Sequence, residues 1–175
     1  MTCCFIGHRE IEETEQLTAE LHRLLTALIA RGVTDFLFGD HSAFDTLCYT
    51  LVTELQKEHP CLRRIHFRMR YPEADEMTME FLLSGYEDCI CLPDTVRAGR
   101  ASYVLRNRAM MRESDVCIFY CNPSYIPQER EADRRNHLPR SPRKSGTRLA
   151  YDYARSQKKE IYNVFPNSAP AEESP

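Results

Sequence analysis

The chain has 175 residues and a formal net charge of −3, with 42% hydrophobic and 28% charged residues. These values are ordinary for a globular protein of one domain with a real core, and the mild acidity argues against a general nucleic-acid binder. No apolar run reaches the roughly 18 residues that a membrane span needs. Because the N-terminus lacks a basic start followed by a long apolar stretch, we expect no signal peptide and a cytoplasmic location.

Helical and strand-like patterns alternate along the chain. Leucines at helical spacing after residue 14 predict a helix that ends at Gly32, and short apolar runs predict strands. The predicted strands cover 2–7, 34–39, 63–69, 88–92, 115–121 and 160–165, and the predicted helices cover 14–31, 43–58, 74–84, 99–114 and 146–159. The strand at 63–69 alternates apolar and polar residues, so we expect it to be more exposed than the others.

This alternation predicts an α/β fold in which helices cover both faces of a mostly parallel sheet. One domain is expected over residues 1–165. Residues 122–145 form a long connection with six Arg or Lys and three acidic residues, which is either a lid over a phosphate site or a solvated insertion. The polar tail at 166–175 is expected to be disordered.

The eight cysteines include no CxxC pair, and most of them fall in or beside strand-like runs. Free cysteine behaves as a small buried hydrophobe, and we expect these thiols to be reduced. No metal site is therefore predicted. Cys89 and Cys91 share one face of their predicted strand, which leaves a metal or redox role as the weaker alternative.

Polar residues follow the first strand, and ligands of parallel sheets bind beyond the carboxyl ends of the strands. Gly7, His8 and Arg9 stand at this point. Gly7 can adopt backbone angles that other residues avoid, and Arg9 can form two parallel hydrogen bonds to a phosphate or carboxylate. The alternative is a turn glycine followed by a solvated arginine.

The second strand runs into Gly39, Asp40 and His41, just before a helix whose N-terminus suits an anion. Ser42 or Asp40 is the expected cap of that helix. Asp45 lies in its first turn, where it either favours the helix dipole or accepts hydrogen bonds from a ribose.

Two later helices add candidates. Tyr103, Arg106 and Asn107 share one face, which offers a ring to stack, a cation for phosphate and an amide for a base or ribose, or else forms an ordinary solvated face. The helix from 146 begins with a good cap and two small residues, which form a second candidate anion site without the spacing of a P-loop. These residues are Ser145, Gly146 and Thr147.

Four stretches in chain order, CCFIGHR, FGDHSAFD, YVLRNRAMMRESDVCIFY and KSGTRLAYDYARSQKKEIYNV, resemble the SLOG superfamily. This superfamily joins the DNA-processing protein Smf/DprA with the LOG ("lonely guy") phosphoribohydrolases, and the chain is most similar to its YpsA-like branch of bacterial proteins. The resemblance spans residues 2 to 165. It implies a Rossmann-like fold, a pocket for a nucleotide or related phosphorylated ligand, and the self-association seen in relatives.

The chain departs from the family patterns at two places. Of the usual GGAxGxD turn it keeps Gly39 and Asp45 at the ends, whereas Asp40, His41 and Ala43 fill the middle. An acid repels phosphate, so we expect phosphate at Arg9, Arg106 and the Ser145 turn, with the second turn facing the sugar or base.

In the LOG motif RKxxM, Arg106 and Met110 match while Asn107 replaces the lysine; in PGGxGTxxE, Ala150 replaces the catalytic Glu.

Three functions follow in order of preference. The first is a non-catalytic sensor or regulator that binds a nucleotide or ADP-ribose-like ligand, without a cofactor or a membrane partner. The second is an N-glycosidase acting on a nucleoside monophosphate, in which Asp45 would supply the missing carboxylate beside Arg106. The third is single-stranded nucleic-acid binding or protein interaction, which the acidic net charge disfavours.

Overall fold

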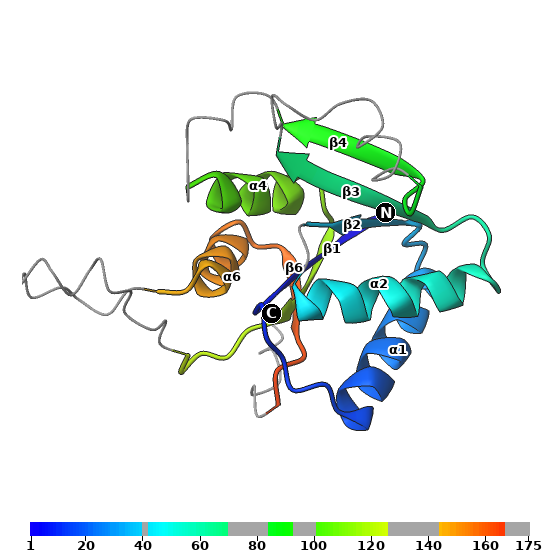
Figure 1. Ribbon diagram of the computed structural model, residues 1–175, viewed down its shortest axis with the longest axis horizontal. Coiled ribbons are helices and arrows are strands. Elements are labelled where there is room, and N and C mark those ends of the chain that lie inside the picture. The colour runs from blue at the N-terminus through cyan, green and yellow to red at the C-terminus, as the bar shows by residue number, and fades with distance from the viewer. Residues whose placement is uncertain (40–41, 70–83, 93–100, 126–143, 167–175) are drawn as a thin grey trace, which may run out of the picture.

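The computed structural model describes residues 1–39, 42–69, 84–92, 101–125 and 144–166 (Figure 1). Its strands are β1 Thr2–Gly7, β2 Asp35–Phe38, β3 Arg63–Met69, β4 Asp88–Leu92, β5 Val116–Tyr120 and β6 Glu160–Asn163. The described helices are α1 Glu15–Ala30, α2 Ala43–Gln56, α4 Ala101–Arg112 and α6 Gly146–Ser156. The predicted helix 74–84, most of the long connection and the tail from 167 fall outside the described residues, apart from Ser84.

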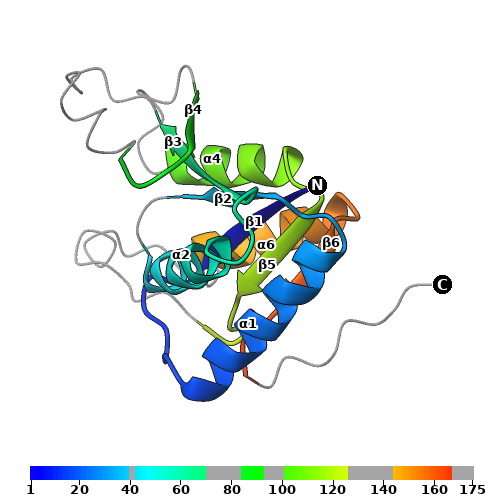
Figure 2. The same cartoon turned by 90° about the vertical axis from the view of Figure 1, so that its right-hand side faces the viewer.

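The six strands form one parallel sheet in the order β4-β3-β2-β1-β5-β6. Helices α1 and α2 cover one face of the sheet, and α4 and α6 cover the other (Figures 1 and 2). The predicted α/β, Rossmann-like arrangement of three layers is thereby confirmed. None of the described helices combines the length and apolar character that a membrane span requires.

The helices begin where the sequence places hydroxyl caps. The Ser42 hydroxyl accepts a hydrogen bond from the Asp45 amide at 3.0 Å, so Ser42, rather than Asp40, caps α2. Thr14 and Ser145 cap α1 and α6 in the same way. Leu21 and Leu25 of α1 are fully buried in a cluster with residues of β1, β2 and β5. Burial of one helix face against the sheet explains the helical spacing of these leucines.

Strand β3 differs from its prediction. His66 and Arg68 are only 5% and 3% exposed, so the expectation of a more exposed strand is wrong at these two polar positions. Because β3 lies between β2 and β4, its edges are covered, and the ring of Tyr86 stacks on His66 at 4.9 Å between centroids. The His66 ring therefore lies inside the protein beneath an aromatic neighbour.

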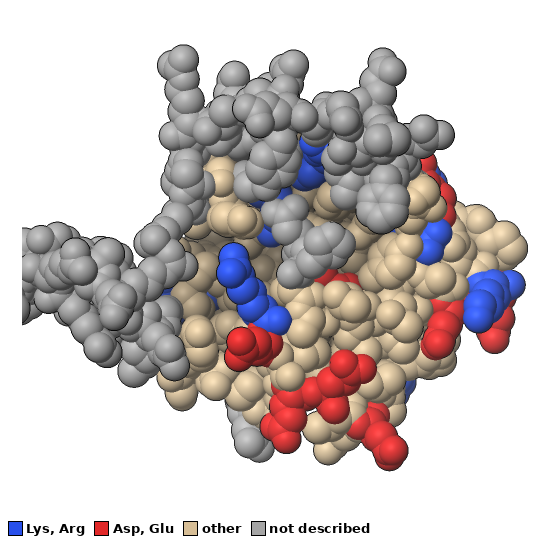
Figure 3. Space-filling view, viewed as in Figure 1, with Lys and Arg blue, Asp and Glu red and all other residues tan. Residues whose placement is uncertain are grey.

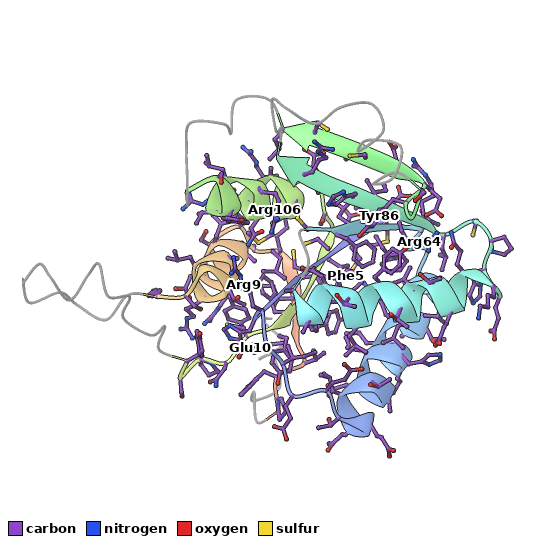
Figure 4. The ribbon with its side chains drawn as sticks, in the orientation of Figure 1. Phe5, Arg9, Glu10, Arg64, Tyr86 and Arg106 are labelled. Carbon is purple, nitrogen blue, oxygen red and sulfur yellow. The ribbon has the colours of Figure 1, made fainter. Side chains whose placement is uncertain are left out.

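Arg64 ties β3 to the segment before β4 and to α2. Its guanidinium hydrogen-bonds Glu87 at 2.6 Å and the Thr53 hydroxyl at 2.8 Å, and it lies 5.0 Å from the ring centre of Tyr49. The Arg64 amide also donates to Glu87, at 2.6 Å. Figure 4 shows Arg64 beside Tyr86 at this end of the sheet. This cluster anchors the outer half of the sheet to α2.

The pH dependence of stability tests this cluster. Burial acts to raise the pKa of Glu87, but hydrogen bonds from Arg64 and Gln56 lower it overall from 4.5 to about 2. The folded state therefore binds fewer protons than the unfolded state, and the stabilisation is complete above pH 4.5 and lost as the pH falls towards 2. Glu87→Gln should lower the free energy of unfolding by about 1 kcal/mol at pH 7, given solvent screening. Urea denaturation should show this difference shrinking below pH 4.5, and a constant difference would contradict the assignment.

The end of β1 approaches α2 so closely that only glycine fits. A Cβ atom on Gly7 would lie 2.4 Å from the Cβ, Cγ and Cδ1 atoms of Phe44, whose side chain is fully buried. By contrast, a Cβ on Gly146 in the first turn of α6 would meet no heavy atom within 4 Å.

These two glycines form a matched pair for mutagenesis. Gly7→Ala should destabilise the fold by about 1–3 kcal/mol, because the buried Phe44 ring or α2 itself has to move. Gly146→Ala should change the free energy of unfolding by less than about 1 kcal/mol, since alanine fits this helical position. Chemical denaturation measures both, and equal effects of the two substitutions would contradict the close approach.

Candidate functional site at the carboxyl edge of the sheet

The strand order reverses at β1, which places a candidate site between β1 and β5. From β1 the chain adds β2, β3 and β4 on one side, and β5 and β6 on the other. In open parallel sheets, ligands bind outside the carboxyl ends of the strands where the order reverses. The segments that reach this point are the residues after β1 and β5 and the first turns of α2 and α6.

Two hydrogen bonds join both helix starts to the end of β1. The Thr147 hydroxyl donates to the Gly7 carbonyl at 3.0 Å, and the Ala43 amide donates to the Arg9 carbonyl at 2.9 Å. Each bond links residues that are far apart in sequence, so the site is a product of the tertiary fold. Gly7, Arg9 and Thr147, all predicted from the sequence, are thus brought together.

His8 holds the segment after β5. Its Nε2 atom accepts a hydrogen bond from the Asn122 amide at 3.0 Å, so the neutral ring carries its proton on Nδ1. The ring packs against Tyr125 at 4.7 Å and meets Tyr120 edge-on at 6.4 Å, and burial lowers the pKa of His8. Its observed role is structural, and contact with a ligand stays a prediction.

Arg106 reaches from α4 to the end of β2. A Cβ on Gly39 would lie 2.8 Å from Nη2 and 2.9 Å from Cζ of Arg106, whose side chain is largely buried. The guanidinium also donates a hydrogen bond to the side-chain oxygen Oδ1 of Asn107 at 3.1 Å and lies 5.5 Å from the ring centre of Tyr103. The predicted face of α4 therefore meets the second turn of the site, with Tyr103 as its exposed member.

Asp45 is buried in the first turn of α2 and bonded to its cap. The Ser42 hydroxyl donates to Asp45 Oδ2 at 2.8 Å while it accepts from the Asp45 amide. This arrangement fits the reading of Asp45 as a residue that favours the helix start, and the ribose contact stays a prediction. Asp40 and His41 lie outside the described residues.

The first turn of α6 combines a cap, an exposed glycine and local ion pairs. The Ser145 hydroxyl accepts from the Arg148 amide at 3.1 Å, and Gly146 is exposed. Asp152 pairs with Lys144 at 2.6 Å and with Arg148 at 3.1 Å. Burial acts to raise the pKa of Asp152, but these partners lower it overall.

Arg9 is the exposed cation of the site. Within the described part of the chain, its side chain has no hydrogen bond or ion pair, and Figure 4 shows it between α2 and α6, with Arg106 farther up at α4. Acidic side chains gather below it on the same face, at the start of α1 (Figure 3). The exposed acids of this segment are Glu10, Glu12, Glu13 and Glu15.

Sequence reasoning missed Asn122 and Tyr125. Both were counted with the long connection 122–145, although they follow directly on β5 and contact His8. The available signal was their place at the carboxyl end of a fully buried strand. No three His, Cys, Asp or Glu side chains within the described ranges converge in a manner suited to a metal ion.

Comparison with known proteins bears on the fold. No protein-family profile and no curated protein sequence matches the chain. A solved structure does match: DNA processing protein A from Helicobacter pylori, reported for its single-stranded DNA binding mode, with a TM-score of 0.50 and 18% identity. The chain has the Rossmann-like fold of that protein. The match covers 92% of this chain but only 63% of the DNA processing protein.

The state of His8 can be measured directly. In NMR spectra of the folded chain, we expect the Nδ1–H tautomer and a His8 pKa below 6.5, because the ring is buried and Nε2 accepts a bond. Tyr125→Ala should move this pKa towards 6.5 by uncovering the ring, whereas Tyr103→Ala on α4 should leave it unchanged. An Nε2–H tautomer would contradict the bond to Asn122.

Proposed function

We propose that the chain binds a nucleotide or an ADP-ribose-like derivative at the carboxyl edge of its sheet and acts as a sensor or regulator. We also propose that it belongs to the SLOG superfamily, in the YpsA-like branch. One observation carries the first proposal: the starts of α2 and α6 are both bonded to the end of β1, beside the exposed Arg9. The positive end of α6 and the cation of Arg9 at one strand end form an anion-binding arrangement, and the start of α2 adjoins it.

The first turn of α6 is the best place for a phosphate. Gly146 is exposed and has open space where a side chain would stand, so a phosphate can approach the backbone amides of this turn. Arg9 can add a charge-assisted pair of hydrogen bonds. At the other helix start, the buried carboxylate of Asp45 disfavours phosphate and suits a sugar hydroxyl instead.

The N-glycosidase alternative has less support. Ala150, at the position of the LOG glutamate, is only 4% exposed and packs in the core beneath α6. Asp152 is paired with Lys144 and Arg148. Asp45, the remaining candidate, is bonded to the Ser42 hydroxyl.

Single-stranded DNA binding is the second candidate function. It is favoured by the match to DNA processing protein A, whose structure was reported for its single-stranded DNA binding mode. This match weakens the expectation from the acidic net charge that nucleic acid is an unlikely partner. Against it stand the four exposed glutamates of residues 10–15 beside Arg9, which would repel a long polyanion. A single nucleotide can occupy the site without crossing this acidic segment.

A ligand panel tests the proposal. Thermal-shift screening of nucleoside mono-, di- and triphosphates and ADP-ribose should give at least one stabilising ligand, to be confirmed by calorimetry. Arg9→Ala should weaken that ligand about tenfold or more, the value of one charge-assisted contact, without changing the melting temperature of the free protein. Arg23→Ala, an exposed arginine on α1, is the matched control and should leave the affinity unchanged.

Measurements on the same wild-type protein separate nucleotide binding from single-stranded DNA binding. No stabilisation by any nucleotide, together with single-stranded DNA binding that weakens steeply with salt, would replace the first proposal by the second. Release of free base from a bound nucleotide would instead establish the glycosidase.

A further inference from the structure

Tyr125 lies beyond the end of β5 with much of its side chain open to solvent. Among the described Phe and Tyr side chains, only Tyr103 and Tyr125 are exposed, at 40% and 48%. The Tyr125 ring packs on the buried ring of His8, with 4.7 Å between the two centroids. The exposed part of the Tyr125 ring therefore faces away from His8. Because Arg9 directly follows His8 in the chain, an aromatic surface and a cation adjoin the same buried histidine.

Hydrogen bonds fix the short segment that carries Tyr125. The amide and the carbonyl of Cys121 both bond to the side chain of Asn163 at 3.0 Å. The Tyr125 amide closes a turn on the Asn122 carbonyl at 3.2 Å, and the Ser124 amide donates to the Asn122 side chain at 2.9 Å. These bonds are already formed in the folded chain, so the segment needs little further ordering to receive a flat partner.

An exposed aromatic ring beside a cation matches the two ends of a nucleotide. Nucleic-acid bases stack on tyrosine rings, and such stacking accepts every base because each has a π-face. Building on the proposed function, we propose that the base of the bound nucleotide stacks on Tyr125, while Arg9 and the first turn of α6 hold the phosphate. The site then takes nucleotides with an intact base and discriminates against sugar phosphates that have lost it.

Tyr103 is the rival ring, since the sequence suggested it for stacking. Its neighbour Arg106 approaches Gly39 at the end of β2, whereas Tyr125 adjoins His8 at the end of β1. A base on Tyr103 would lie towards the β2 turn, but a base on Tyr125 lies beside β1 and β5. The strand order reverses between β1 and β5, and ligands of open parallel sheets bind at that point. The topology therefore favours Tyr125.

Calorimetric titration of the full chain tests the stack. The base-containing probes are AMP, GMP, CMP, UMP and ADP-ribose, and the base-free probe is ribose 5-phosphate, which should bind the wild type at least about tenfold more weakly than the tightest of them. Tyr125→Ala should weaken that tightest probe about tenfold or more, the value of one stacked base, whereas Tyr125→Phe keeps the ring and should bind as the wild type. Leu105→Ala removes another exposed apolar side chain and is the matched control.

Fluorescence gives a second, direct readout of the same contact. The chain contains no tryptophan, so Tyr125→Trp introduces a single indole. A base stacked on this indole should quench its emission as AMP or ADP-ribose is added, and ribose 5-phosphate should leave the emission unchanged. Circular dichroism and melting temperatures establish that each variant folds.

Two results would overturn the inference and leave the nucleotide site in place. One is a base-containing probe that binds Tyr125→Ala as tightly as the wild type. The other is a loss of affinity in Tyr103→Ala while the emission of Tyr125→Trp does not respond to the bound probe, which would move the stack to α4. Failure of every probe to bind the wild type would instead remove the proposed function and the stack together, so the two failures are distinguishable.

Discussion

The contact between Gly7 and Phe44 fixes the geometry on which the rest of the site depends. It lets the first turn of α2 lie directly against the end of β1, with no side chain between them. At this distance the Ala43 amide reaches the Arg9 carbonyl, and the chain leaving β1 takes one defined path. A side chain at position 7 would force the Phe44 ring or α2 itself to move. The packing of one buried ring thus determines where Arg9 emerges.

The end of β1 also bonds to α6, on the opposite face of the sheet, and to the segment after β5. The Gly7 carbonyl accepts from Thr147 of α6, while His8 accepts from the Asn122 amide beyond β5. Main-chain atoms and neutral side chains therefore hold the site together, and these groups are already used by the fold. Such a scaffold is preorganised, because these hydrogen bonds are already formed in the folded chain. What it leaves available is a side chain, Arg9, and the open turn at Gly146.

The sequence was sufficient for the layout but not for the contacts between distant segments. Strands and helices were found within a few residues because their apolar spacing is local, and the parallel sheet follows from their alternation. The burial of His66 was missed, since it depends on Tyr86, twenty residues later in the chain. The approach of Arg106 to Gly39 was suggested only by the family resemblance and not by periodicity, because it joins a helix on one face to the end of a distant strand. Periodicity reports which face of an element is apolar, but not which neighbour covers its polar face.

Charged side chains at the carboxyl edge differ in how far the fold engages them. The carboxylates near the two helix starts are engaged, Asp45 by the hydroxyl of Ser42 and Asp152 by Lys144 and Arg148. Asp45 lies in the first turn of α2, bonded to its cap, and Asp152 lies in the second turn of α6, held in two ion pairs. Arg9 is the opposite case, a cation that the described residues leave to solvent. The end of β1 therefore presents a cation to solvent, while Asp45 and Asp152 are held by partners within the fold.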